Sequence, residues 1–125
     1  MDNKKTFLFL LLILVIASFF RLWHLNSIPP GLYPDEAMNG NNALEAIKTG
    51  EYKLYYPENN GREGLFINLQ ALSLKIFGIN ILSLRLVSAL IGILTVLGLY
   101  FLTKELFNST AIALLSMFFI ATSFW

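Results

Sequence analysis

The sequence predicts an all-α membrane protein with about three transmembrane helices. Hydrophobic residues make up 56% of the chain and charged residues only 14%. In a typical soluble domain, roughly half of the residues are hydrophobic and about a quarter are charged. The apolar residues also gather in blocks, and crossing a bilayer takes roughly 20 of them in one helix. These blocks lie at about 6–25, 81–102 and 110–125, and a long polar loop, about 26–80, separates the first two.

The first block, FLFLLLILVIASFF, follows the short basic start MDNKKT. A secretory signal peptide begins in the same way, but its cleavage site needs small residues, and here FRLWHL follows the apolar run. We therefore expect a retained signal anchor. Arg21 and Trp23 at its far end suit the membrane interface, where Trp is enriched and Arg can extend its charge towards water.

The second block carries Arg85 near its start, where the guanidinium is expected to reach the lipid headgroups. The third block follows the polar link TKELFNST and runs for only about 15 residues, which is short for a complete span. We therefore expect a truncated sequence, the N-terminal portion of a longer polytopic protein whose C-terminal remainder is missing.

Lysines predict the orientation in the membrane. Lys4 and Lys5 crowd the short N-terminus and Lys104 falls on the same side, whereas the basic residues of the loop are widely spread. Because short cytoplasmic segments are enriched in Lys and Arg, the N-terminus is expected in the cytoplasm and the loop outside it. The expected location is the cell (plasma) membrane, with several passes.

The same composition argues against several functions. The net charge is +1 with no basic stripe, so no nucleic-acid partner is expected. There are no cysteines, which excludes disulfides and thiolate metal sites. No Ser-His-Asp set, P-loop or metal-spaced His pair is present. Transporters often carry an ionisable residue at the middle of a span, and none is found there, which argues against a transporter module.

Two short interfacial helices are predicted inside the loop. The first has Asp35 as its N-cap, starts at Glu36 and stops at Gly50. The second, LFINLQALSLKIFG, has about 13 residues and is too short to cross a bilayer. Its apolar residues recur at helical spacing, so it is expected to lie in the membrane interface or beneath the helix bundle.

The adjacent acids Asp35 and Glu36 have two interpretations. They are a helix cap and a first-turn acid that complements the helix dipole, or they are carboxylates that act as a general base or bind a divalent cation at the membrane surface. Capping does not require two acids. Arg62 and Glu63, in NNGREGLF, form either a solvated turn with a weak ion pair or a phosphate site in which Gly61 and Gly64 admit a ligand.

The order of these segments carries a resemblance. An anchor ending FFRLWHL is followed by PDEAMNGNNALEAIKTG, YYPENNGREGLFINLQALSLKIFG and LSLRLVSALIGILTVLGLYFLTKELF. This order is similar to the N-terminal part of the membrane glycosyltransferases of GT-C type, within them to the protein mannosyltransferase and lipid A aminoarabinose transferase-like group. The resemblance extends from about Phe20 to Phe107.

The resemblance implies an enzyme that passes a sugar from a polyprenyl-phosphate donor to an extracytoplasmic acceptor. Asp35 would then activate the acceptor hydroxyl or bind a metal, with Glu36 in support, and Arg62 would hold the carrier phosphate. Many relatives have Pro after the basic residue where this chain has Glu63, whose assignment to the phosphate site is therefore weaker. No cofactor is implied beyond a divalent metal at Asp35. The alternative is a non-enzymatic small membrane protein, or an inactive fragment, whose loop helices bind a partner.

Overall fold

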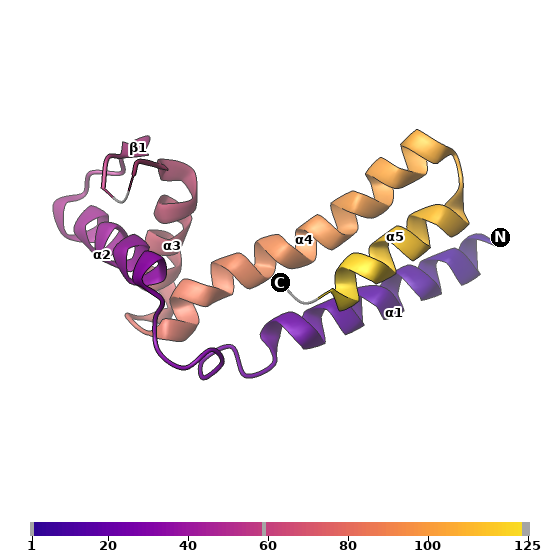
Figure 1. Ribbon diagram of the computed structural model, residues 1–125, viewed down its shortest axis with the longest axis horizontal. Helices are drawn as coiled ribbons and strands as arrows, with labels where there is room; N and C mark the ends of the chain where they lie inside the picture. Colours follow the sequence, from indigo (N-terminus) through magenta and orange to yellow (C-terminus); the bar gives the residue numbers. More distant parts are fainter. Residues whose placement is uncertain (1, 59, 124–125) are drawn as a thin grey trace. The chain divides into compact units, whose positions relative to one another are not determined.

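The computed structural model describes residues 2–58 and 60–123. Within them the chain is helical apart from one short pair of strands, which confirms the predicted all-helical class (Figure 1). The elements in chain order are α1 (Asn3–Leu22), α2 (Pro34–Thr49), β1 (Tyr55–Tyr56), β2 (Arg62–Glu63), α3 (Gly64–Phe77), α4 (Ile81–Phe107) and α5 (Thr110–Thr122).

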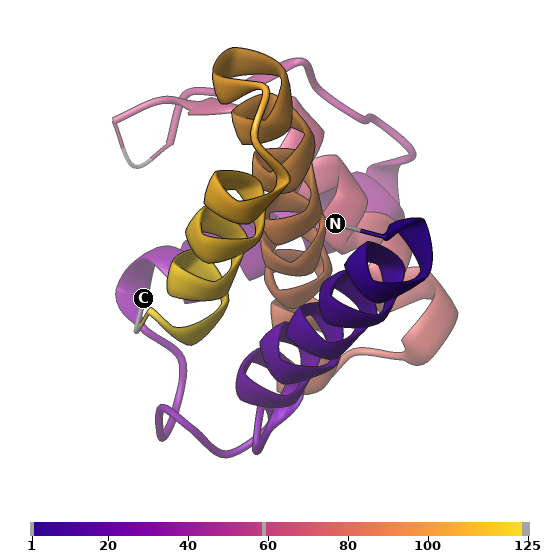
Figure 2. The same ribbon diagram turned by 90° about the vertical axis from the view of Figure 1, so that its right-hand side faces the viewer.

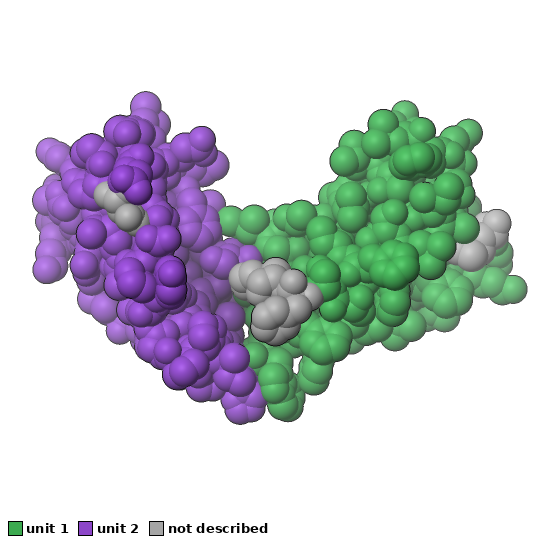
Figure 3. Space-filling model, viewed as in Figure 1, with its two compact units in different colours: residues 1–23, 89–125 green, residues 24–88 purple. Residues whose placement is uncertain are grey.

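The chain forms two compact units, which Figure 3 colours separately. Residues 1–23 and 89–125 form what we call the span unit, and residues 24–88 form the loop unit. Helix α4 contributes its first part to the loop unit and the rest to the span unit. The predicted loop, about 26–80, thus folds as a body of its own together with the start of the following helix.

The core of the span unit lies where α1, α5 and the C-terminal part of α4 meet (Figure 2). Several of its buried residues are small, which allows helices to approach closely in a membrane. The buried members are Ile13, Ala17, Val96, Tyr100, Ala113, Leu114, Met117 and Ala121. Many large apolar side chains of the same helices are exposed, among them Phe7, Leu11, Leu94 and Phe101. A bilayer removes the cost of that exposure.

Two helices, α1 and α4, are long and apolar enough to cross a membrane. Helix α4 continues to Phe107, so most of the expected polar link TKELFNST is helical. Helix α5 has 13 described residues, which is below the length of a span. The third span therefore stays a prediction, and its last two residues, 124–125, lie outside the described residues.

Arg21 does not extend to the interface as expected, because its side chain is only 6% exposed. Its guanidinium donates to the carbonyl oxygens of Ile120 and Ala121, at 3.0 and 3.3 Å. The last carbonyls of a helix lack intrahelical partners and attract a cation, which explains the correction. A Cβ at Gly92 would lie 2.9 Å from Nε of Arg21, so this glycine makes room for the side chain.

The loop unit is built on the packing of α2 against α3. Its core consists of Ala43, Ala46, Tyr56, Ile67, Ala71, Leu74 and Leu84. Helix α2 ends as predicted, with Gly50 in the left-handed conformation (φ 77°) that ends many helices. The prediction of Asp35 as N-cap is wrong, because Tyr33 is the N-cap and Pro34 the first helical residue. Proline suits that position, since its φ is already helical and no amide hydrogen is needed there.

The strands β1 and β2 form an antiparallel hairpin in which Tyr55 faces Glu63 and Tyr56 faces Arg62. Tyr56 is buried and its hydroxyl donates to Oδ1 of Asn68 at 2.9 Å, which ties the hairpin to α3. A Cβ at Gly61 would collide with the Tyr55 ring, and one at Gly64 with the backbone of residues 53–54. These contacts explain why both positions are glycine, and the hypothesis that the two glycines admit a ligand stays a prediction.

Candidate functional site

The two adjacent acids of α2 turn to different partners within the loop unit. Asp35 Oδ1 lies 3.2 Å from Nη2 of Arg62, and Glu36 Oε1 lies 2.7 Å from Nε of Arg85. Successive helical residues point about 100° apart, so neighbours at the start of one helix can reach different elements. The structure thus brings Asp35 and Arg62 together and gives Glu36 a separate environment.

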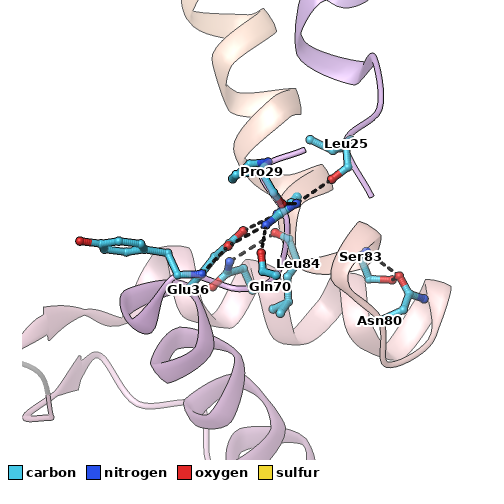
Figure 4. Close-up of polar contacts among 10 residues, drawn as sticks. Leu25, Pro29, Glu36, Gln70, Asn80, Ser83 and Leu84 are labelled. Carbon is cyan, nitrogen blue, oxygen red and sulfur yellow. Dashed lines mark hydrogen bonds and ion pairs between the residues drawn. The ribbon is translucent and has the colours of Figure 1, made fainter. Parts of the chain in front are cut away.

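Arg85 is the centre of a buried network that we call the arginine clamp. Its guanidinium binds Glu36 and donates to three backbone carbonyls, those of Leu25 (3.1 Å), Pro29 (3.0 Å) and Gly31 (2.5 Å). In Figure 4 the carboxylate of Glu36 and the carbonyls of Leu25 and Pro29 converge on this point. The clamp therefore holds the chain segment that leads into α2.

The expectation that Arg85 reaches the lipid headgroups is wrong, because only 5% of its side chain is exposed. The segment Leu25–Gly31 contains two prolines and forms no helix or strand, so its carbonyls need donors from elsewhere. A guanidinium has five N–H donors in a fixed plane and can satisfy several acceptors at once. The guanidinium of Arg85 therefore binds these carbonyls instead of the lipid headgroups.

Glu36 is held as a carboxylate. The hydrogen bond from Arg85 lowers the pKa of Glu36, and desolvation by partial burial opposes this shift. The backbone N–H of Tyr33 also donates to Oε2 of Glu36, at 3.3 Å, and lowers its pKa further. With both oxygens bound inside the protein, Glu36 is placed to fix the start of α2.

Asp35 and Arg62 are more open than the arginine clamp. The Asp35 side chain is 55% exposed and the Arg62 side chain 29%. Arg62 also donates through Nη1 to Oδ1 of Asn39, at 3.2 Å. One anion and one partly exposed cation therefore lie side by side, and a ligand can approach both.

Glu63 does not join this pair as the sequence suggested. It follows Arg62 in β2, and successive strand residues point to opposite faces. Glu63 is exposed and occupies the N-cap position of α3, without a side-chain capping hydrogen bond.

The described residues do not form a metal site. Among residues 2–58 and 60–123, no group of three or more His, Cys, Asp or Glu side chains could hold a metal ion. Both oxygens of Glu36 are engaged by Arg85, so the neighbour of Asp35 is not available as a second ligand. The described part of the chain offers no set of donor groups that would hold a divalent metal at Asp35.

Two residues of the site were missed by sequence reasoning. Asn39 lies four residues after Asp35, so it shares a helix face with it, and this spacing was a usable signal. Arg85 offered no such signal, because its partners lie 49 to 60 residues earlier in the chain. Only the fold brings those groups together.

Comparison with known proteins supports the family resemblance for the C-terminal half of the chain. Residues 65–125 match the family model of the dolichyl-phosphate-mannose-protein mannosyltransferases. Asp35, Glu36 and Arg62 lie before the matched range, whereas Arg85 lies within it. No solved structure matches this chain.

A protein of Aquifex aeolicus (strain VF5), described as an uncharacterized protein, is 31% identical over 125 aligned residues. The alignment covers 96% of this chain and 24% of the relative. The chain thus spans about a quarter of the length of that relative. The family match confirms the predicted resemblance: over residues 65–125 this chain carries the sequence pattern of the dolichyl-phosphate-mannose-protein mannosyltransferases, which are glycosyltransferases of GT-C type.

Proposed function

We propose that this chain is part of a membrane glycosyltransferase that moves a sugar from a polyprenyl-phosphate donor to an extracytoplasmic acceptor hydroxyl. The observation that carries the proposal is the partly exposed pair of Asp35 and Arg62, whose charged atoms lie 3.2 Å apart. The family match over residues 65–125 and the two candidate membrane helices support the proposal. A lipid-linked donor needs a site at the membrane surface, and a loop unit between two spans can provide one.

Each member of the pair has a chemical role in this proposal. The bond between the anomeric carbon and the donor phosphate breaks as the bond from the acceptor oxygen forms. Negative charge then grows on the leaving phosphate, and Arg62 stabilises it through charge-assisted hydrogen bonds. Asp35 accepts the proton of the acceptor hydroxyl as that oxygen attacks.

Glu36 acts as a positioning residue in the same proposal. Its carboxylate is bound by Arg85 and by the Tyr33 N–H, which leaves it poorly placed to receive a proton from an acceptor. By fixing the first turn of α2, it holds the neighbouring Asp35 in one place. Asp35 is thus the reacting carboxylate, and its neighbour Glu36 is the carboxylate that positions it.

Substitution of Asp35 tests the proposal in the full-length protein. We expect Asp35→Asn to reduce sugar transfer from a lipid-phosphate donor by about 10²- to 10⁴-fold, the usual contribution of a general base. Glu45→Gln, on the same helix and at an exposed ion pair, is the matched control and should leave transfer unchanged. Normal transfer by Asp35→Asn, at equal membrane abundance, would remove Asp35 from the mechanism.

A second candidate function is partner binding without catalysis, which the surface of α3 favours. This helix exposes apolar side chains at helical spacing, namely Leu65, Leu69, Leu72 and Ile76. If the loop unit only binds a partner, a charge on this stripe (Leu72→Glu) abolishes the function and Asp35→Asn preserves it. The enzymatic proposal predicts a large loss of transfer from Asp35→Asn.

A further inference from the structure

Arg62 is held by two residues of α2 that lie one helical turn apart. Its Nη2 pairs with Oδ1 of Asp35, and its Nη1 donates to Oδ1 of Asn39, both at 3.2 Å. Residues four apart lie on the same helix face. The guanidinium therefore bridges an anionic and a neutral acceptor along one side of α2.

The two acceptors differ in burial and in charge. Asn39 is 7% exposed, whereas the Asp35 side chain is 55% exposed. A buried side chain has little rotational freedom, so the Asn39 oxygen is a fixed reference point. As a neutral amide it directs the guanidinium without cancelling its positive charge, which a second carboxylate would do.

We propose that Asn39 is a positioning residue that holds Arg62 ready for the phosphate of a lipid-linked donor. This inference rests on the proposed function, because it assigns Arg62 to that phosphate. An incoming phosphate can replace the exposed carboxylate of Asp35 at Nη2, while the contact to Asn39 at Nη1 persists. Arg62 then keeps its orientation as its anionic partner changes.

The remainder of the loop unit supports this arrangement. Arg62 lies in β2, opposite the buried Tyr56 of β1, so its backbone is restrained by the hairpin. The long side chain is the mobile part, and a planar guanidinium loses less freedom on binding when its orientation is already set. The hairpin restrains the backbone of Arg62, and Asn39 restrains the guanidinium at the end of its side chain.

Binding of farnesyl phosphate tests the inference without requiring sugar transfer. With purified full-length protein in detergent, we expect Asn39→Leu to raise the Kd for farnesyl phosphate about tenfold, which corresponds to about 1.4 kcal/mol. Arg62→Ala should raise it at least as much. The double variant should bind no more weakly than Arg62→Ala alone, because Asn39 acts through Arg62.

Two further variants separate positioning from general damage to α2. Asn42→Leu is the matched control, because Asn42 is a buried asparagine of the same helix whose Nδ2 has no hydrogen-bond partner. It should leave the Kd unchanged. Asn39→Asp keeps the size and the acceptor but adds a negative charge, so it should weaken binding while preserving the thermal unfolding temperature.

Several outcomes overturn the inference. An unchanged Kd in Asn39→Leu, an additive loss in the double variant, or an equal loss in Asn42→Leu each removes Asn39 as a positioning residue. Wild-type protein that does not bind farnesyl phosphate also overturns it, since Arg62 then holds no lipid phosphate. Normal binding in a protein that transfers no sugar leaves this inference standing and contradicts the proposed function.

Discussion

The carboxylate of Glu36 lies 2.7 Å from Nε of Arg85, a residue 49 positions later in the chain. This pair joins the first turn of α2 to the second turn of α4, and the same guanidinium holds the carbonyls of Leu25, Pro29 and Gly31. The start of α2, which carries Asp35 and Glu36, is therefore anchored by Arg85 of the same loop unit.

Removal of the Glu36 charge should destabilise the protein. Glu36→Gln leaves a buried guanidinium without its anion, and breaking a buried pair in this way costs ~3 kcal/mol. Denaturant unfolding followed by circular dichroism measures this loss. The matched control is Glu45→Gln, whose pair with Lys53 is exposed and should contribute much less than the buried pair. Equal losses in the two variants would contradict the assigned importance of the arginine clamp.

Exchange of the two charges should fail to restore stability. In the double variant Glu36→Arg with Arg85→Glu, the ion pair can re-form but the three backbone carbonyls face a carboxylate without hydrogen-bond donors. Buried acceptors without partners are costly, at about 1–3 kcal/mol each. We expect the exchanged protein to be at least as unstable as Glu36→Gln in the same unfolding measurement. Full recovery would show that the pair, and not the carbonyls, determines the stability of this region.

The pH dependence of stability should carry the signature of Glu36. Its pKa is lowered in the folded state, so the unfolded chain binds its proton more readily in the interval between the two pKa values. The stabilisation is complete above the unfolded value, about 4.3, and is lost as the pH falls through the lower folded value. The difference in unfolding free energy between wild type and Glu36→Gln should therefore shrink below about pH 4. A constant difference would contradict the pKa direction.

Substitution of Gly64 should disturb the hairpin. A Cβ there would collide with the carbonyl of Lys53, and the Gly64 N–H donates to the Leu54 carbonyl at 2.8 Å. We expect Gly64→Ala to cost about 2 kcal/mol, as overpacking usually does. Gly98→Ala is the control, because in the described part of the chain no atom beyond the adjoining residues and the local helix backbone lies within 4 Å of its added Cβ. It should be neutral or stabilising by about 0.5–1 kcal/mol, since alanine suits a helix interior better.

The orientation of the loop unit in the membrane can be tested by labelling, because the chain contains no cysteine. Leu54 is 93% exposed, so Leu54→Cys should react with a membrane-impermeant maleimide added outside intact cells. Glu105→Cys, on the predicted cytoplasmic side, should react only after permeabilisation. The reverse pattern would place Asp35 in the cytoplasm and contradict an extracytoplasmic sugar transfer.

The helical class, the two long apolar helices and the two short helices in the loop were all predictable from the amino-acid sequence. These features follow from local information: the length of apolar blocks, helical periodicity and stop signals such as Gly50. The adjacent acids and the glycine-flanked Arg62 were two of the features that suggested a site, but the family resemblance, not local information, assigned roles to Asp35 and Arg62. Local signals failed at the start of α2, where Pro34 as the first helical residue displaced Asp35 from the cap.

The partners of the charged residues depend on how the chain folds in three dimensions. Glu36 binds Arg85, Arg62 bridges Asp35 and Asn39, and Arg21 binds the end of α5. The residues in these contacts are 23 to 100 positions apart in the chain. A side chain with five donors satisfies whichever unpaired carbonyls and carboxylates folding brings within reach, and the local sequence around an arginine does not specify them.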